Sequence, residues 1–208
     1  MYQLRLDKGT SFAKNVLSMK ANSLTCILTL SIIISQPAIA SLLNVDFESG
    51  ALGSHPIKVG FAATGETAND YWNFYTRSNP DGSWRSSGLL NNLTYASGGA
   101  SGVDLTVNNG AGYWSNGSSD PMYDGYIYPL PNGPGLTVTV SKLSPGTYNF
   151  YLYSHDSTFN LNVNGSDLGT KRCFNLPVVD PPLWREGLHY ALFGNVQIAD
   201  SEAIAVVS

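Results

Sequence analysis

The stretch TYNFYLYSHD, residues 147–156, alternates between two kinds of side chain. In an extended strand successive side chains point to opposite faces, so Tyr148, Phe150 and Leu152 form one apolar face. The other face carries Asn149, Tyr151 and Tyr153. Aromatic residues on both faces predict a strand inside a sandwich, with its second face covered by neighbouring loops. The alternative is a concave, solvent-exposed face that grips a ligand.

The same two-residue period recurs along the chain. It is present in GVDLTV (102–107), LTVTV (136–140) and FNLNVNG (159–165), each with apolar residues facing one way and polar residues the other. FNLNVNG ends in Asn164-Gly165, the dipeptide that a two-residue hairpin turn requires, because both central residues need positive φ. Further strands are predicted at 43–47, 57–62, 71–76, 125–128, 189–198 and 203–207.

These short strands, separated by turns rich in Gly, Pro and Asn, predict an all-β fold: an antiparallel β-sandwich of the jelly-roll type. No window keeps a helical period with caps, so almost no helix is expected. No internal repeat or linker divides residues 41–208, which we interpret as a single domain. Its longest irregular stretches, about 77–100 and 108–124, are the places to look for function because long loops often carry it.

Residues 1–40 resemble a secretory signal rather than domain sequence. The apolar run LTCILTLSIII, residues 24–34, has the length of a signal-peptide core and is too short to span a bilayer. Lysines precede it, and Ala38-Ile39-Ala40 supplies the small-x-small pattern before a cleavage site. The sequence therefore predicts an exported protein that begins at Ser41, with Met19 as an equally good start and an N-terminal membrane anchor as the alternative.

Charge and cysteine content narrow the range of partners. The predicted mature chain has seven Lys and Arg against fourteen Asp and Glu, and no basic cluster, which argues against nucleic acid and anionic membrane surfaces. No membrane span is expected after residue 40.

Cys173 is the single cysteine left after removal of Cys26, and we expect it to be a small buried apolar residue rather than a reactive thiol.

Several stretches, read in order, resemble a known family. They are NVDFESG, NDYWNFY, SGVDLTV, DPMYDGYIY, LSPGTYNFYLYSHD, FNLNVNG and WREGLHYALFGNVQI. Together they resemble exported β-sandwich modules of bacterial envelope proteins that often carry a Pro-Glu-Pro C-terminal sorting signal. More distantly, they look like galactose-binding-like and malectin-like jelly rolls, a resemblance that implies carbohydrate binding. The family usually continues through one more strand and a sorting tail, so the chain is either a fragment truncated at its last strand or a short secreted member.

No catalytic signature is present, and no catalytic residue is predicted. Sugar binding needs an aromatic face for the apolar side of a pyranose, with amide or carboxylate groups for its hydroxyls. The loop NNGAGYWSNGSSDPMYDGY, residues 108–126, has that composition. Its candidate ligand-binding residues are Tyr113, Trp114, Asn116, Asp120 and Asp124. The alternative for Trp114 is a buried plug over the end of the sandwich.

Two further sets of residues complete the predicted site. Trp84 follows a Pro-Asp-Gly turn beside Arg85 and is a candidate for the rim of the same sugar site. A structural calcium ion is a weaker possibility, because carboxylates suit its preference for oxygen ligands. Its candidate ligands are Asp46, Glu48, Asp70 and Asp156.

The sequence therefore predicts a secreted, non-catalytic module at the cell surface or outside the cell, which binds carbohydrate or a cell-surface polymer. A secreted polysaccharide-active hydrolase or lyase is the first alternative. A structural or adhesive exoprotein with no defined ligand is the second.

Overall fold

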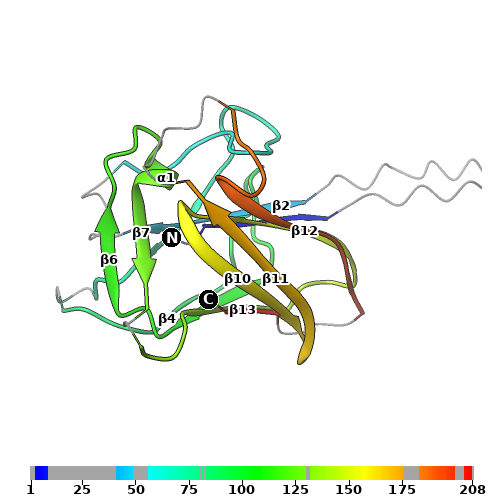
Figure 1. Ribbon diagram of the computed structural model, residues 1–208. Helices are drawn as coiled ribbons and strands as arrows, with labels where there is room; N and C mark the ends of the chain where they lie inside the picture. Colours follow the sequence, from blue (N-terminus) through cyan, green and yellow to red (C-terminus); the bar gives the residue numbers. More distant parts are fainter. Residues whose placement is uncertain are drawn as a thin grey trace, which may run out of the picture.

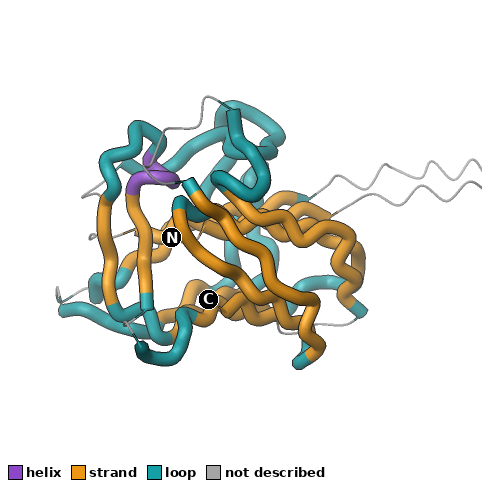
Figure 2. The backbone as a smooth tube through the Cα atoms, viewed as in Figure 1, coloured by secondary structure: helices purple, strands orange, loops and turns teal. Residues whose placement is uncertain are grey.

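The computed structural model describes residues 3–8, 41–48, 56–79, 81, 83–129, 132–175, 183–199 and 204–207. Within these ranges the elements are almost entirely strands (Figures 1 and 2). They are β1 (Gln3–Lys8), β2 (Leu42–Glu48), β3 (Asn73–Thr76), β4 (Gly88–Leu90), β5 (Asp104–Asn108), β6 (Gly112–Ser115), α1 (Pro121–Asp124), β7 (Gly125–Tyr128), β8 (Thr137–Ser141), β9 (Gly146–Tyr153), β10 (Asp156–Val163), β11 (Ser166–Phe174), β12 (Tyr190–Ile198) and β13 (Ile204–Val207).

The strands form two sheets and a separate ribbon. One sheet has the order β12-β9-β1-β2-β3, the other has the order β11-β10-β13-β8-β5-β4, and β6 pairs only with β7. Neighbouring strands are antiparallel except for the parallel pair β2 and β3. The prediction of an all-β sandwich with almost no helix is confirmed, since the described part contains only the four-residue helix α1. The strand order does not establish a jelly-roll connection.

The main core lies between the two sheets. Buried side chains reach it from both, including Phe47 and Phe150 of the first sheet and Leu105 and Phe159 of the second. Each buried side chain of this size contributes about 1.5–3 kcal/mol to the free energy of folding. The ribbon closes one side of the core with Ile127.

The second face of β9 is packed, as the sequence predicts. Tyr148, Phe150 and Leu152 belong to the main core, whereas Tyr153 is fully buried in a smaller cluster on the outer side of the first sheet. This outer cluster also contains Trp72 and Met122, and half-buried Trp184 packs against it. The phenol oxygen of Tyr153 accepts a hydrogen bond of 3.1 Å from the backbone N–H of Ala63.

The predicted strand at 57–62 is wrong, because this segment is a loop that covers the outer face of the first sheet. Ile57, Val59 and Phe61 do alternate with buried residues, but their side chains point outward into solvent. The segment lies over the first sheet: Lys58 donates its backbone N–H to Asp46, and Gly60 has a φ of +79°. It is therefore a covering loop rather than a strand of a sheet.

The other strand predictions agree with the structure within one or two residues, apart from the start of β10. The Asn164-Gly165 turn joins β10 to β11 with φ values of +48° and +81°, as the dipeptide predicts. Four strands were not predicted, namely β1, β4, β6 and β11. Of these, β1 lies within the predicted signal segment, whose apolar run at 24–34 and cleavage pattern at 38–40 fall outside the described residues.

Candidate functional site

The predicted sugar-binding loop contains a regular two-stranded ribbon instead of an irregular connection. In β6 and β7, Tyr113 is opposite Ile127 and Trp114 is opposite Tyr126. Because side chains alternate along a strand, Tyr113 and Trp114 point to opposite faces. Tyr113 faces the core side with Ile127, and Trp114 faces outward.

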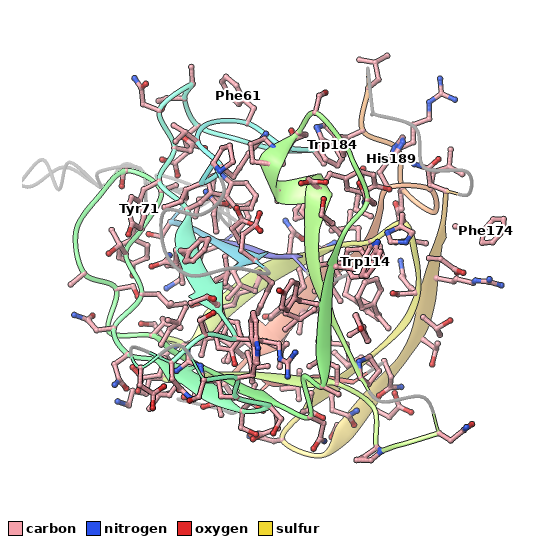
Figure 3. All side chains as sticks on the ribbon, turned by 90° about the vertical axis from the view of Figure 1, so that its left-hand side faces the viewer. Phe61, Tyr71, Trp114, Phe174, Trp184 and His189 are labelled. Atoms are coloured by element: carbon pink, nitrogen blue, oxygen red, sulfur yellow. The ribbon has the colours of Figure 1, made fainter. Side chains whose placement is uncertain are left out.

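Trp114 is the most exposed tryptophan in the structure, with 64% of its surface accessible to solvent. Figure 3 shows the molecule from the side on which the ribbon lies. The alternative of a buried plug is therefore wrong for Trp114. An exposed indole on a regular strand presents a flat apolar surface to solvent, which is the property that stacking on a sugar requires.

Two tyrosines extend this surface along the ribbon. Tyr126 and Tyr128 lie two residues apart on β7, so they share the outward face with Trp114, and their ring centroids are 6.2 Å apart. Tyr128 is 38% exposed. Its ring lies across Gly112, where a Cβ atom would overlap it. We call Trp114, Tyr126 and Tyr128 the aromatic strip.

The side chain of His155 packs against Tyr126 of the aromatic strip. Its imidazole meets the ring of Tyr126 edge-on, with centroids 5.0 Å apart. Burial raises the pKa of Tyr126 above its usual value and lowers the pKa of His155, so both side chains are held in their neutral forms. His155 Nδ1 is buried and has no hydrogen-bond partner among the described residues.

The predicted polar residues of the loop hold the loop itself together. Asn116 donates through its amide to the carbonyl of Tyr123 at 2.7 Å and accepts the N–H of Ser118 at 2.9 Å. Asp120 caps α1 by accepting the N–H of Met122 at 3.1 Å, and it also forms an ion pair with the buried Lys58. These groups therefore stabilise the ribbon and its connection, rather than projecting beside Trp114.

In Asp124, only one of the two carboxylate oxygens takes part in such hydrogen bonds. Its Oδ1 atom accepts hydrogen bonds of 2.7 Å from the hydroxyl of Ser115 and from the N–H of Gly117. Within the described ranges its Oδ2 atom makes no hydrogen bond. Because side chains alternate along β6, the hydroxyl of Ser115 lies on the face of Tyr113, so Asp124 is at the end of the ribbon but not on the face of Trp114.

Trp84 lies beside the ribbon but not on the strip. Its ring stacks on Tyr113 with centroids 4.6 Å apart and an angle of 37°, and 52% of its surface stays exposed. The guanidinium of Arg77 lies 5.9 Å from the Trp84 ring. Trp84 therefore contacts Tyr113, but Tyr113 faces the other way from Trp114, so the two tryptophans do not share the one rim that was predicted.

The predicted calcium ligands do not converge. Asp46 and Glu48 are fully buried on the outer face of β2. Asp70 closes a turn by accepting the N–H groups of Glu66 and Thr67, and exposed Asp156 pairs with Arg172 at 3.2 Å. The part of the chain that the structure describes contains no group of three or more His, Cys, Asp or Glu side chains placed to hold a metal ion.

Cys173 is buried and hydrogen-bonds weakly to the carbonyl of Leu152 at 3.8 Å, as its predicted role as a core residue requires. Burial raises the pKa of its thiol to about 12. Burial thus disfavours the thiolate, in agreement with the packing of this side chain in the main core.

A second aromatic group surrounds His189 above the first sheet. Its imidazole lies 5.9 Å from both Tyr123 and Trp184, and its Nδ1 accepts the backbone N–H of Arg185 at 3.0 Å (Figure 3). Burial lowers the pKa of His189 and raises that of Tyr123 to about 12. Since His189 is 5% exposed, this group supports the covering loops and presents no open site.

Open grooves lined by described residues lie at the edges of the sandwich, and two of them are large. One lies between β3 and β4, has a volume of about 440 Å³, and contains the exposed Tyr71 with Arg85 and Asn91. The other lies between β11 and β12, has a volume of about 640 Å³, and is lined by residues such as Leu168 and Phe193. Neither groove includes the aromatic strip. Only the first combines an exposed aromatic ring with amide groups.

No helix in the described ranges is long and apolar enough to cross a membrane. Comparison with known proteins adds no identification, since no family model, curated protein or solved structure matches the chain. The residues that sequence reasoning missed at the site are Tyr126, Tyr128 and His155. The Tyr-Ile-Tyr alternation of β7 was a usable signal for the tyrosines, whereas the position of His155 depends on tertiary packing.

Proposed function

We propose that the protein is a non-catalytic carbohydrate-binding module that acts outside the cell or at its surface, and that the aromatic strip is its ligand site. The observation that supports the proposal is the outward face of the ribbon, where Trp114 and Tyr128 are both exposed on a regular backbone. An exposed ring costs free energy through its contact with water, and stacking on the apolar face of a sugar recovers part of that cost.

The shape of the strip favours an oligosaccharide chain over a single sugar. Trp114 and Tyr128 are diagonal neighbours across the ribbon, and such residues lie about 7–8 Å apart, with a somewhat shorter distance between their Cβ atoms. Two rings at that separation form a surface longer than one pyranose ring. Gly112 allows the Tyr128 ring to lie over the backbone of β6, where any side chain would overlap it.

On the strip, the phenol group of Tyr128 is both donor and acceptor for a sugar hydroxyl. Asp124, whose Oδ1 atom accepts the hydroxyl of Ser115, offers a further acceptor at the end of the ribbon. Neutral ligands suit this site, because the predicted mature chain is acidic and would repel a polyanion.

The alternative of a hydrolase or lyase has no specific observation in its favour among the described residues. Asp46 and Glu48, two carboxylates on the same face of β2, are buried under the loop at 56–62 and α1. Glycoside hydrolysis needs two carboxyl groups on either side of an accessible bond. The alternative of an adhesive exoprotein with no defined ligand differs from the proposal only in its lack of a glycan partner.

A glycan array with the intact chain and three variants tests the proposal. Trp114→Ala should reduce binding to every glycan that the parent binds, about fivefold or more, because an aromatic contact contributes about 1 kcal/mol. Trp84→Ala removes an exposed tryptophan elsewhere and is the matched control. Tyr71→Ala tests the groove between β3 and β4. Unchanged binding by Trp114→Ala, or a selective loss with either control variant, would place the ligand elsewhere.

A further inference from the structure

Two arginines, Arg77 and Arg85, lie opposite each other beyond the end of β3, and neither forms an ion pair with a described acid. The backbone N–H of Arg85 donates to the carbonyl of Arg77 at 2.9 Å beside a short antiparallel bridge. Arg77 is buried, with 8% of its surface accessible to solvent. Lys58 is buried to the same extent, but it pairs with Asp120. The buried charge of Arg77 therefore lacks the compensation that Lys58 has.

Each guanidinium group is held in place by a backbone carbonyl and an aromatic ring. Arg77 donates through Nε to the carbonyl of Arg85 at 3.0 Å, and its guanidinium lies 5.9 Å from the ring of Trp84. Arg85 donates through Nε and Nη2 to the carbonyl of Thr76 at 3.1 and 2.9 Å, and its guanidinium lies 5.1 Å from the ring of Tyr75. Carbonyl groups and rings fix the two side chains but carry no net charge, so both positive charges stay uncompensated.

The two charges act on the same buried phenol group. Tyr75 is fully buried, and its hydroxyl makes no hydrogen bond within the described ranges. Burial raises the pKa of Tyr75, and the charges of Arg85 and Arg77 oppose that rise. A Cβ atom at Gly88 would lie 2.7 Å from the Tyr75 hydroxyl and 2.9 Å from Cζ of Arg85, so these two groups are neighbours. Positive charge removed from water without a counter-charge costs free energy, which an anion bound beside it would recover.

The groove between β3 and β4 gives an anion access to Arg85. Arg85 lines this groove, whose volume of about 440 Å³ lies in the range of ligand pockets, about 300–1,000 Å³. Nη1 of Arg85 makes no hydrogen bond to any described residue. Together with Nη2 it forms the edge of the guanidinium that binds two oxygens of one carboxylate or phosphate group.

The other groups at the groove also suit an anion. Asn91 lines the groove, is exposed, and donates its side-chain amide to none of the described residues. None of the residues that line the groove is acidic. Asp104 accepts the backbone N–H of Asn92 at the rim through one oxygen, and its other oxygen pairs with Lys142. The charge of this carboxylate is therefore already compensated.

We propose that the groove between β3 and β4 is an anion-binding site, in which the free edge of Arg85 binds two oxygens of a carboxylate or phosphate group on a small ligand. Asn91 donates a further hydrogen bond to the ligand, and Arg77 adds positive charge from the interior. The site goes beyond the proposed carbohydrate binding, because the aromatic strip lies outside the groove and suits neutral ligands.

Thermal melting of the intact chain tests the site. Sodium acetate, as a carboxylate, or sodium phosphate is added in steps, and sodium chloride keeps the ionic strength constant. We expect the melting temperature to rise and to saturate, because a ligand that binds only the folded chain stabilises it according to its dissociation constant. The anion that saturates at the lower concentration identifies the ligand class. Phosphate also stabilises proteins without binding to a site, so the comparison between variants decides.

Three variants separate the site from general salt effects. Arg85→Gln removes the free guanidinium edge, and Asn91→Asp places a carboxylate in the groove at an exposed position. Each should weaken anion binding about tenfold or more, because a hydrogen-bonded charge is lost or opposed. Arg185→Gln is the matched control, since it removes the same charge from an exposed arginine outside the groove. It should bind the anion within about twofold of the parent.

A saturating rise that Arg85→Gln and Asn91→Asp lose and Arg185→Gln keeps supports the site. No saturation in the intact chain, or the same response in all three variants, overturns it. If Arg85→Gln does not fold, because it also loses the contact with Thr76, the exposed Asn91→Asp variant decides by the same comparison. Trp114→Ala should keep the full anion response, so failure of the groove and failure of the aromatic strip are distinguishable.

Discussion

Tyr153 gives the sharpest test of the packed second face of β9. Its phenol oxygen accepts the N–H of Ala63 at 3.1 Å, and its ring meets Trp184 edge-on at 5.2 Å. Tyr153→Phe keeps the ring and leaves the Ala63 N–H without its partner, which costs about 1 kcal/mol because Ala63 is only half-buried. Tyr153→Ala removes the ring as well, and loss of a buried aromatic side chain costs about 3–5 kcal/mol.

Urea unfolding of the full chain, followed by tryptophan fluorescence, measures both costs. Tyr190→Phe is the matched control: its ring lies 5.8 Å from Tyr153, but its hydroxyl makes no hydrogen bond in the part of the chain that is described. We expect no change in its free energy of unfolding. Each kcal/mol lost should lower the melting temperature by about 2–4 °C in a chain of this size. If Tyr153→Phe matches Tyr190→Phe, and Tyr153→Ala costs less than about 1 kcal/mol, the loops do not pack on this face.

Three further changes have defined outcomes. Gly112→Ala should displace the Tyr128 ring and weaken glycan binding several-fold, which glycan titration measures. Thermal melting should show little loss of stability, because the displaced Tyr128 ring is exposed. Asp120→Ala should cost about 3 kcal/mol or more in urea unfolding, because it removes the cap of α1 and leaves the buried Lys58 without its ion-pair partner. Acidification should destabilise the fold as the pH falls below about 6.5, because burial lowers the pKa of His155 and the unfolded chain then binds more protons than the folded one.

Each of these changes has its own control. Gly110→Ala adds the same methyl group at a position where its nearest contacts are at 3.5 Å, so binding should not change. Glu186→Ala removes the ion pair with Lys171, in which both side chains are exposed, and the urea midpoint should stay within error. His155→Gln should reduce the slope of stability against pH below 6.5. An equal effect of both glycine variants, or of both ion-pair variants, would contradict the corresponding explanation.

The period-2 pattern predicted the strands that bury one face and missed those that do not. β11 has a single buried side chain, Cys173, so it carries no alternation to detect. The segment 57–62 alternates but shows its apolar side to solvent, and only the tertiary structure reveals that reversal. β1 does alternate Leu4, Arg5 and Leu6, but it lies in the segment that the sequence assigns to a signal peptide, so it was not predicted as a strand.

The sequence predicted which kinds of residue occur at the site, but not the directions in which their side chains point. The choice of Trp114 as an exposed ring agrees with the structure, because glycines around it in sequence cannot cover an indole. Asn116 and Asp120 were assigned to the ligand, but short polar side chains in tight loops bond to nearby backbone groups, as both do here. Which oxygen faces solvent depends on the loop conformation, and the sequence does not specify that.

The most direct test of carbohydrate binding on the aromatic strip is the fluorescence of Trp114 during titration with a glycan selected on the array. Trp84→Phe is used as the background, so that Trp114 is the only tryptophan with more than half of its surface exposed; Trp72 is buried and Trp184 half-buried. Stacking should move the emission to shorter wavelength and protect the indole from acrylamide quenching. Binding that calorimetry detects while the emission and quenching of Trp114 stay unchanged would contradict the proposed site.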